Sequence, residues 1–215
     1  AFHIDFAEIE RIEVTRGPFA AGTGGLGGSI DILTRKPSPG LHLDLLAGAG
    51  AWGYVAPSAA IAYGGERWSA KAGFSSRSGG AYQDGDGVRF TELLPPGATA
   101  AYLPSAHDAQ AFDVQTGWLG LGWIPRSGER LELEVTHQAA DVQLYPYLQM
   151  DARNDDATRA RATYRALRSG KRIEQIEASL GWSRVDHLMD DRLRVSGSRA
   201  PRPYSMVTDA DAEDG

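Results

Sequence analysis

The sequence predicts an all-β chain that forms part of an antiparallel transmembrane β-barrel. Segments of about ten residues alternate apolar and polar side chains, and the connections between them alternate between short and long. No stretch reaches the roughly 18–20 apolar residues that a membrane-crossing helix needs. The negative mean hydropathy and the 42% hydrophobic content of the 215 residues fit a barrel, because only one face of each strand is apolar.

The alternation is clearest at residues 131–138. Leu131, Leu133 and Val135 lie on one face of this predicted strand, and Glu132 and Glu134 point to the opposite face. The same pattern predicts further strands at 66–77, 158–167 and 173–185, and weaker ones at 41–50, 54–64 and 111–124. The part of the chain after residue 40 therefore predicts seven strands, or eight if one follows the last long connection.

The connections predict which end of the sheet faces outward. Short turns are expected at 64–66, 125–129 and 168–171, and long loops at 78–110, 141–157 and 185–206. Short turns at one end and long loops at the other are typical of an outer-membrane barrel. Arg159, Arg161 and Arg165 on the polar face of one strand suit a watery lumen. The alternative is the solvated outer face of a soluble sheet.

The first 37 residues follow a different pattern. Residues 6–14 predict a short helical turn that leads into a strand, and Gly17 and Pro18 end it. A glycine-rich stretch over residues 20–28 precedes a second strand at 29–34, and residues 35–40 form a linker. Glycine permits positive φ angles and close approach of the backbone, so this stretch is expected to pack against another surface.

Two blocks in this part resemble the plug-domain signature of the TonB-dependent outer-membrane receptors. The blocks are Ile9–Pro18 and Gly27–Pro37, and the signature residues are Arg16, Gly17, Pro18, Gly27 and Gly28. One departure is the segment Phe19–Gly24, which replaces the aromatic-glycine pair usual after Gly-Pro. The resemblance implies a plugged barrel of roughly 22 strands, of which this chain holds about seven or eight. It also implies a plug end at residues 1–37 and barrel strands and external loops at 38–215.

The resemblance further implies a receptor in the outer membrane of a Gram-negative type of cell. Its partners would be the TonB energy-transducing complex, the outer-membrane lipid and a metal or metal-chelate cargo. Iron-siderophore is the commonest cargo of the family, and no resident cofactor is expected. The alternative is a secreted or surface all-β binding or adhesion module without a transport role. A passive porin is disfavoured, since porins carry no plug signature.

A narrower resemblance lies in the expected outer loops, at Leu144–Asp151, Asn154–Asp156 and Val185–Asp191, which look like blocks of the copper-receptor branch. In that branch a His-x-Met pair on an external loop contributes to metal binding, and here the pair is His187 and Met189. Met150 and Met206 also fall in expected loops, and thioether sulfur suits Cu(I). Ordinary loop residues are the alternative. The carboxylates that could hold hard cations, or form a solvated charged surface, are Asp151, Asp155, Asp156, Asp190 and Asp191.

Several classes of function are excluded or disfavoured. The net charge of −6 argues against a nucleic-acid partner, and the absence of cysteine excludes disulfides and thiolate metal sites within the chain. No nucleophile elbow or zinc-protease motif is present, so no enzyme is predicted. The chain starts without Met or a leader-like segment, and we expect it to be a piece of a longer protein. The candidates for interfacial aromatic girdles are Trp52, Tyr54, Trp68, Trp118, Trp123 and Trp182.

Overall fold

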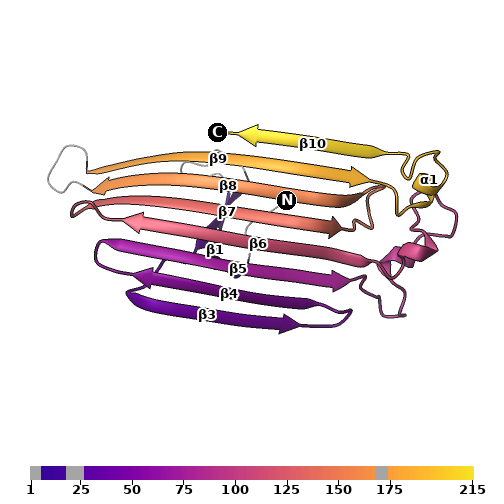
Figure 1. Cartoon of the computed structure of the whole chain (residues 1–215), viewed down its shortest axis with the longest axis horizontal. Coiled ribbons are helices and arrows are strands. Elements are labelled where there is room, and N and C mark those ends of the chain that lie inside the picture. Colours follow the sequence, from indigo (N-terminus) through magenta and orange to yellow (C-terminus); the bar gives the residue numbers. More distant parts are fainter. Residues whose placement is uncertain (1–5, 18–26, 168–173) are drawn as a thin grey trace.

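The computed structural model describes residues 6–17, 27–167 and 174–215, which form one large sheet, one separate hairpin and a set of loops at one end (Figure 1). The hairpin consists of β1 (Ile9–Arg16) and β2 (Gly28–Thr34). The strands of the sheet are β3 (Gly40–Ala49), β4 (Val55–Gly64), β5 (Trp68–Gly80), β6 (Gln110–Trp123), β7 (Glu129–Gln143), β8 (Asp151–Leu167), β9 (Gln175–Asp190) and β10 (Val207–Asp214). The helices are the short η1 (Phe90–Glu92), η2 (Pro104–Ala106) and α1 (Val195–Ser198).

The eight strands of the sheet lie in sequence order from β3 to β10, and every neighbouring pair is antiparallel. This is the up-and-down arrangement that the alternating connections predict, and β10 supplies the eighth strand. The expected turn at 168–171 lies outside the described residues. No helix among the described residues is long and apolar enough to cross a membrane.

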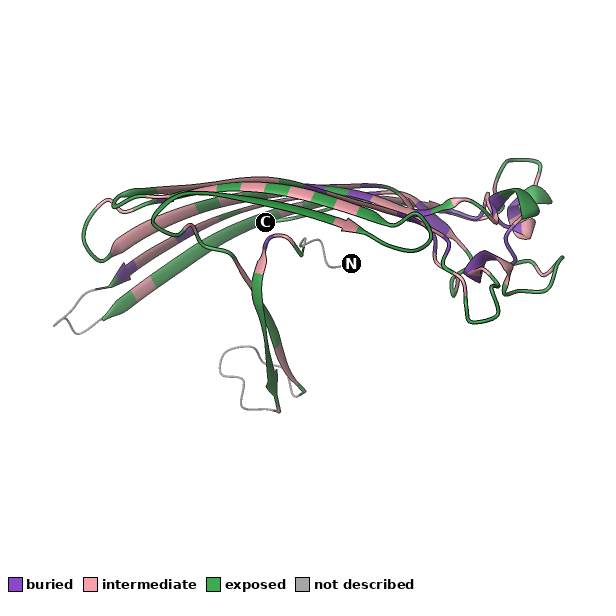
Figure 2. Ribbon diagram, turned by 90° about the horizontal axis from the view of Figure 1, so that it is seen from below, coloured by how far each residue is buried: buried purple, intermediate pink, exposed green. Residues whose placement is uncertain are grey.

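The sheet is curved (Figure 2). Its two faces also differ in chemistry. The convex face carries large apolar side chains that are exposed, among them Leu43, Leu121 and Leu133. The concave face carries the polar partners of the alternation, such as Lys71, Glu134 and the three arginines of β8. An exposed apolar band over several strands costs free energy in water and is stable against lipid. The convex face therefore argues against the soluble binding or adhesion module.

The candidate girdle residues do not all lie where an interfacial girdle requires them. Trp68 and Trp123 are cross-strand partners on the convex face, and their rings stack with centroids 5.4 Å apart. They lie at the end of the short turns, as a girdle requires. Trp118 instead lies on the concave face, where its ring covers Gly73; a Cβ there would come 2.2 Å from the Trp118 ring. Trp118 is thus not a girdle residue.

The strand ends at the loop side extend further than the alternation predicts. The connection expected at 141–157 is only 144–150, and the one expected from residue 185 begins at 191. These strand ends carry polar residues on both faces, so the period-two pattern is lost although the ladder hydrogen bonds continue. β8 has 17 residues, more than the roughly 9–11 that cross a bilayer, and it therefore projects beyond the lipid.

Among the described residues, the buried hydrophobic cluster lies at the loop end and not under the sheet. It consists of Ala81, Phe90, Tyr102, Ala106, Ala111 and Leu144. Its members come from the loop 81–109, the start of β6 and the loop 144–150. The outer loops therefore pack on one another and form a small folded cap at one edge of the wall.

Candidate functional site

The hairpin β1–β2 stands off the concave face of the sheet (Figure 2). Four of the signature residues meet at its far end: Arg16 pairs with Gly28, and the Gly17 amide donates to the Gly27 carbonyl oxygen at 3.2 Å. Gly28 has φ +126°, and a Cβ on it would lie 2.1 Å from the Thr15 oxygen, so this position requires glycine. Pro18 lies outside the described residues. The boundary between residues 37 and 38 stays a prediction.

Lys71 joins the hairpin segment to the wall. Its Nζ lies 3.4 Å from the Glu8 carboxylate ahead of β1 and 2.9 Å from the Glu134 carboxylate on β7. Nζ also donates to Thr34 Oγ1 and to the Arg35 carbonyl oxygen, both at 3.4 Å. The Glu8 side chain is buried, at 7% exposure, and the Lys71 side chain is nearly so, at 10%. This contact therefore ties both ends of the hairpin to two strands of the wall.

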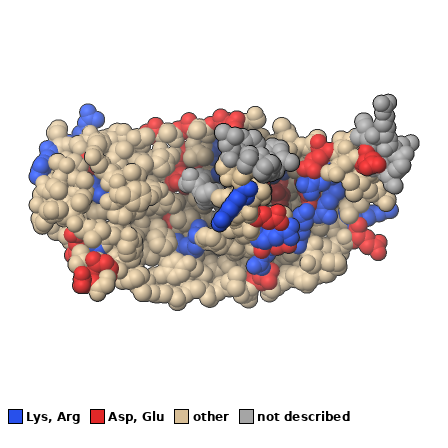
Figure 3. Space-filling view, turned by 180° about the vertical axis from the view of Figure 1, so that it is seen from behind, with Lys and Arg blue, Asp and Glu red and all other residues tan. Residues whose placement is uncertain are grey.

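A glycine on β6 makes this reach possible. Gly120 is the cross-strand partner of Lys71, and a Cβ on it would lie 2.7 Å from the Lys71 Cε. The lysine stem lies flat over this glycine and so extends from β5 across β6 to Glu134 on β7. Charged side chains gather beside the hairpin, whereas the surface toward the loops is mostly uncharged (Figure 3).

The concave surface also holds a charged cavity of about 410 Å³ between β2 and the wall. Arg130 and Arg165 on its wall both bind Glu132, at 2.8 and 3.8 Å. Arg165 also binds Glu177 at 3.0 Å. Two of the arginines on the inner face, Arg130 and Arg165, thus have carboxylate partners. The watery-lumen interpretation of Arg159, Arg161 and Arg165 stays a prediction.

A second cavity, of about 610 Å³, lies at the loop end, and we call it the aromatic pocket. None of its lining residues is charged. Its aromatic residues are Trp52, Tyr54, Tyr82, Phe90, Phe112, Tyr145 and Tyr147. Three of the rings form a row, because Trp52 contacts Tyr82 at 6.3 Å and Tyr82 contacts Phe90 at 4.8 Å between ring centres. Tyr54 and Phe112 form a separate pair at 6.2 Å. Trp52 and Tyr54 therefore line a pocket, whereas the sequence suggested a girdle.

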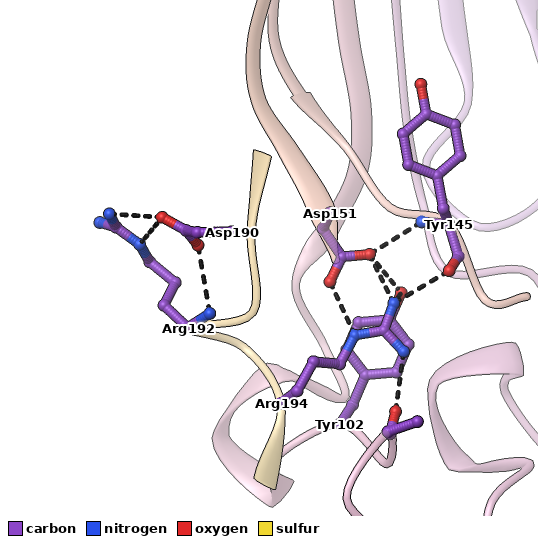
Figure 4. Close-up of polar contacts among 7 residues, drawn as sticks. Tyr102, Tyr145, Asp151, Asp190, Arg192 and Arg194 are labelled. Carbon is purple, nitrogen blue, oxygen red and sulfur yellow. Dashed lines mark hydrogen bonds and ion pairs between the residues drawn. The ribbon is translucent and has the colours of Figure 1, made fainter. Parts of the chain in front are cut away.

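A buried polar cluster lies behind this pocket, and we call it the arginine cluster: Arg194, Asp151 and Tyr102 (Figure 4). Arg194 binds both carboxylate oxygens of Asp151 at 2.7–2.8 Å, and its guanidinium lies 3.6 Å from the centre of the Tyr102 ring. Tyr102 donates its hydroxyl to Asp151 at 2.7 Å. Burial, reinforced by the charge and hydrogen bond of Asp151, raises the pKa of Tyr102, so the hydroxyl stays protonated.

The predicted metal residues lie elsewhere. His187 and Met189 are two residues apart on β9, on the concave face, and not on an external loop as expected. The loop prediction was wrong because the polar strand end hid the strand pattern. His187 Nδ1 is 3.4 Å from the buried Asp155 carboxylate on β8. Met150 ends the loop 144–150. Within the described residues, no three His, Asp or Glu side chains form a group that could hold a metal ion.

Asp191 holds the loop 191–206 onto the end of β9. Its carboxylate accepts hydrogen bonds from the amides of Ser205 and Met206, at 2.8 and 3.0 Å, and from the hydroxyls of Ser196 and Ser205. Burial by itself raises the pKa of Asp191, but these hydrogen bonds outweigh it and lower the pKa to about 2.

This lowered pKa predicts acid sensitivity of the loop. The ionised carboxylate is favoured in the folded loop, so its contribution to stability is complete above the ordinary pKa of 3.8 and is lost as the pH falls toward 2. Hydrogen exchange of the full-length protein, corrected for intrinsic rates, should show protection of the Ser205 and Met206 amides decreasing over this range. Asp191→Asn should have low protection at neutral pH and little pH dependence. Protection that falls equally in both proteins would contradict the assignment.

Comparisons with known proteins agree with this geometry. No protein-family model matches the chain. It is 35% identical to the rhizobactin receptor of Rhizobium meliloti (strain 1021) over 103 residues, which are 43% of the chain and 13% of that receptor. Its fold matches that of the copper transporter OprC with a TM-score of 0.78 and 18% identity, over 98% of the chain and 30% of OprC. The ferric enterobactin receptor PfeA from Pseudomonas aeruginosa matches with a TM-score of 0.46 and 14% identity, over 98% of the chain and 41% of PfeA.

The chain thus spans well under half the length of each of these relatives. The sequence match and the fold agree with the resemblance of the two signature blocks to TonB-dependent outer-membrane receptors. Sheet β3–β10 has the fold of a segment of such a barrel wall. The rhizobactin receptor and the copper transporter OprC are a receptor and a transporter, in agreement with the prediction that the chain is not an enzyme.

Proposed function

We propose that the whole protein captures a scarce nutrient, a metal or a metal chelate, at the cell surface and imports it with energy from the TonB complex. The attachment of the hairpin β1–β2 to the concave face through Lys71 carries this proposal. A passive pore needs no such segment in its lumen, whereas an energised receptor needs one that can be held and displaced.

The aromatic pocket favours an organic chelate as the cargo over a bare metal ion. Its 610 Å³ lies in the range of about 300–1,000 Å³ usual for small-molecule sites. A naked cation needs carboxylate, imidazole or sulfur ligands, and this lining offers none of them. Aromatic rings instead pack well on the apolar or planar parts of a chelator. The 35% identity to a rhizobactin receptor points in the same direction.

Copper is the second candidate, and His187 is the observation that favours it. The imidazole of His187, the thioether of Met189 and the Asp155 carboxylate gather on the concave side of β8 and β9. Soft sulfur with imidazole suits Cu(I). We propose His187 and Met189, with Met150 from the adjoining loop, as the metal contacts if copper is the cargo.

Metal content of the full-length protein separates the two cargoes. The receptor would be purified from outer membranes after separate exposure to copper, zinc and a ferric siderophore, and analysed for elements. We expect iron to be retained with the chelate, and copper to stay far below one equivalent. One equivalent of copper that is lost in His187→Ala/Met189→Ala, and kept in a His137→Ala control, would establish the copper receptor instead.

Uptake tests the energy requirement. Cells that express the receptor should accumulate the iron of the chelate only when the TonB complex is intact, and cells without that complex should still bind the chelate at the surface. Equal uptake in both kinds of cell would point to a passive pore and contradict the proposal. Binding without uptake in both would favour a surface binding module.

A further inference from the structure

Arg194 is fully buried, although it lies in an outer loop. Taking a guanidinium out of water is costly unless its donors are all used. The Arg194 guanidinium donates hydrogen bonds to the Asp151 carboxylate and to the Tyr102 hydroxyl at 2.7 Å. It also donates to the carbonyl oxygens of Tyr145 and Ala100, at 2.9 and 2.8 Å. One side chain therefore contacts both of the other long loops of the chain.

The same contacts lead directly to the aromatic pocket. Arg194 binds the carbonyl oxygen of Tyr145, and Asp151 accepts the amide of Tyr145 at 2.8 Å, so both backbone groups of this pocket residue are held. On the other side, Tyr102 lies under the Arg194 guanidinium and contacts the ring of Phe90 at 6.2 Å. Phe90, from the loop 81–109, and Tyr145, from the loop 144–150, both line the pocket. The arginine cluster thus fixes the distance between two loops that form its walls.

A neighbouring arginine in the same loop, Arg192, forms an ion pair that is local in the sequence. Arg192 binds Asp190, at 2.6 and 2.7 Å, and its side chain is about one third exposed (Figure 4). Among the described residues, the hydrogen bonds and ion pairs of Arg192 are all made to Asp190, at the adjoining end of β9. Arg192 therefore serves as a matched control for Arg194: it is the same residue type, in the same loop, with a carboxylate partner that does not line the pocket.

We propose that Arg194 is a positioning residue that sets the width of the aromatic pocket and thereby its selectivity for ligands with a planar aromatic group. The inference rests on the proposed function, because it takes the aromatic pocket as the site of capture. Arg194 does not touch the ligand; it acts through Tyr145 and through the Tyr102–Phe90 contact. Without the guanidinium N–H groups of Arg194, the loops 81–109 and 144–150 can move apart. A flat aromatic ring of a ligand in the pocket then loses contact with one wall.

Selectivity separates positioning from a merely structural role. The probes are a ferric tris-catecholate, which has aromatic rings, and ferric citrate, which has none, both measured on the full-length receptor. In Arg194→Lys, which keeps the charge, we expect the preference for the catecholate to fall by about ten-fold, a change of about 1.4 kcal/mol in relative affinity. Arg192→Lys should leave it unchanged. An equal loss for both chelates would mean a structural role only and overturn the inference.

A distance measurement needs no ligand. The chain has no cysteine, so spin labels can be placed at Leu94→Cys and Leu148→Cys after any cysteines elsewhere in the full-length protein are replaced. Both positions are exposed and lie in the two loops. We expect a longer and broader distance distribution in Arg194→Lys and an unchanged one in Arg192→Lys. An unchanged distance in Arg194→Lys overturns the inference even if chelates bind, whereas a changed distance in a receptor that binds neither chelate overturns only the proposed function.

Discussion

Charge reversal at Lys71 should release the hairpin segment from the wall. Lys71→Glu places a carboxylate between the carboxylates of Glu8 and Glu134, where the lysine ammonium now binds both. Breaking a buried ion pair costs about 3–5 kcal/mol, and the like charges add to this. A spin label at the exposed position Glu10→Cys in the full-length receptor should therefore become mobile at a much lower urea concentration than in the parent.

Two further variants test the cause. Glu8→Lys combined with Lys71→Glu restores opposite charges and should recover much of the lost urea resistance. Arg11→Glu breaks the exposed pair with Glu13 at the hairpin surface, where such pairs contribute about 0–1 kcal/mol, and should change little. If all three variants mobilise the label equally, the hairpin is held by something other than the Lys71 contact.

The faces of the sheet were predictable from the sequence because side chains of a strand alternate strictly. Leu133 and Glu134 had to point to opposite faces, whatever the register. The order of the strands followed from the lengths of the connections. Where a strand leaves the lipid, both faces meet water, and the alternation no longer carries information. For this reason His187 was placed in a loop, although it belongs to β9.

The aromatic pocket and the arginine cluster were not predictable in this way. Arg194 and Tyr102 are 92 residues apart, in two loops without a repeating pattern. Asp151, 43 residues before Arg194, is the first residue of β8, where the alternation is already lost. Trp52 was assigned to a girdle, since an isolated aromatic residue near a turn looks the same in either role. The one available signal was the occurrence of arginines and aspartates together in the outer segments, but the same aspartates also fit cation ligands or a solvated surface.

Removal of Asp151 should unfold the outer loops locally while the sheet stays intact. In Asp151→Ala the Arg194 guanidinium remains buried and loses the carboxylate that it binds through two nitrogen atoms. Such an uncompensated charge costs about 3–5 kcal/mol. Hydrogen exchange of the full-length receptor should then accelerate around Tyr102 and Tyr145, with the ladder amides of β6 and β7 unaffected. Asp211→Ala, which breaks the half-exposed pair with Arg184, should produce no such change.

A double variant tests whether the Asp151–Arg194 pair contributes mainly to stability or to the geometry of the pocket. Asp151→Leu/Arg194→Met replaces it with apolar side chains, and such replacements of buried ion pairs are often neutral or stabilising. We expect protection of Tyr102 to return close to that of the parent, because no charge is left unpaired. The aromatic pocket should stay altered, since neither new side chain can hold the backbone of Tyr145. Recovery of stability without recovery of catecholate preference would show that the pair is retained for the geometry it imposes and not for the stability it gives.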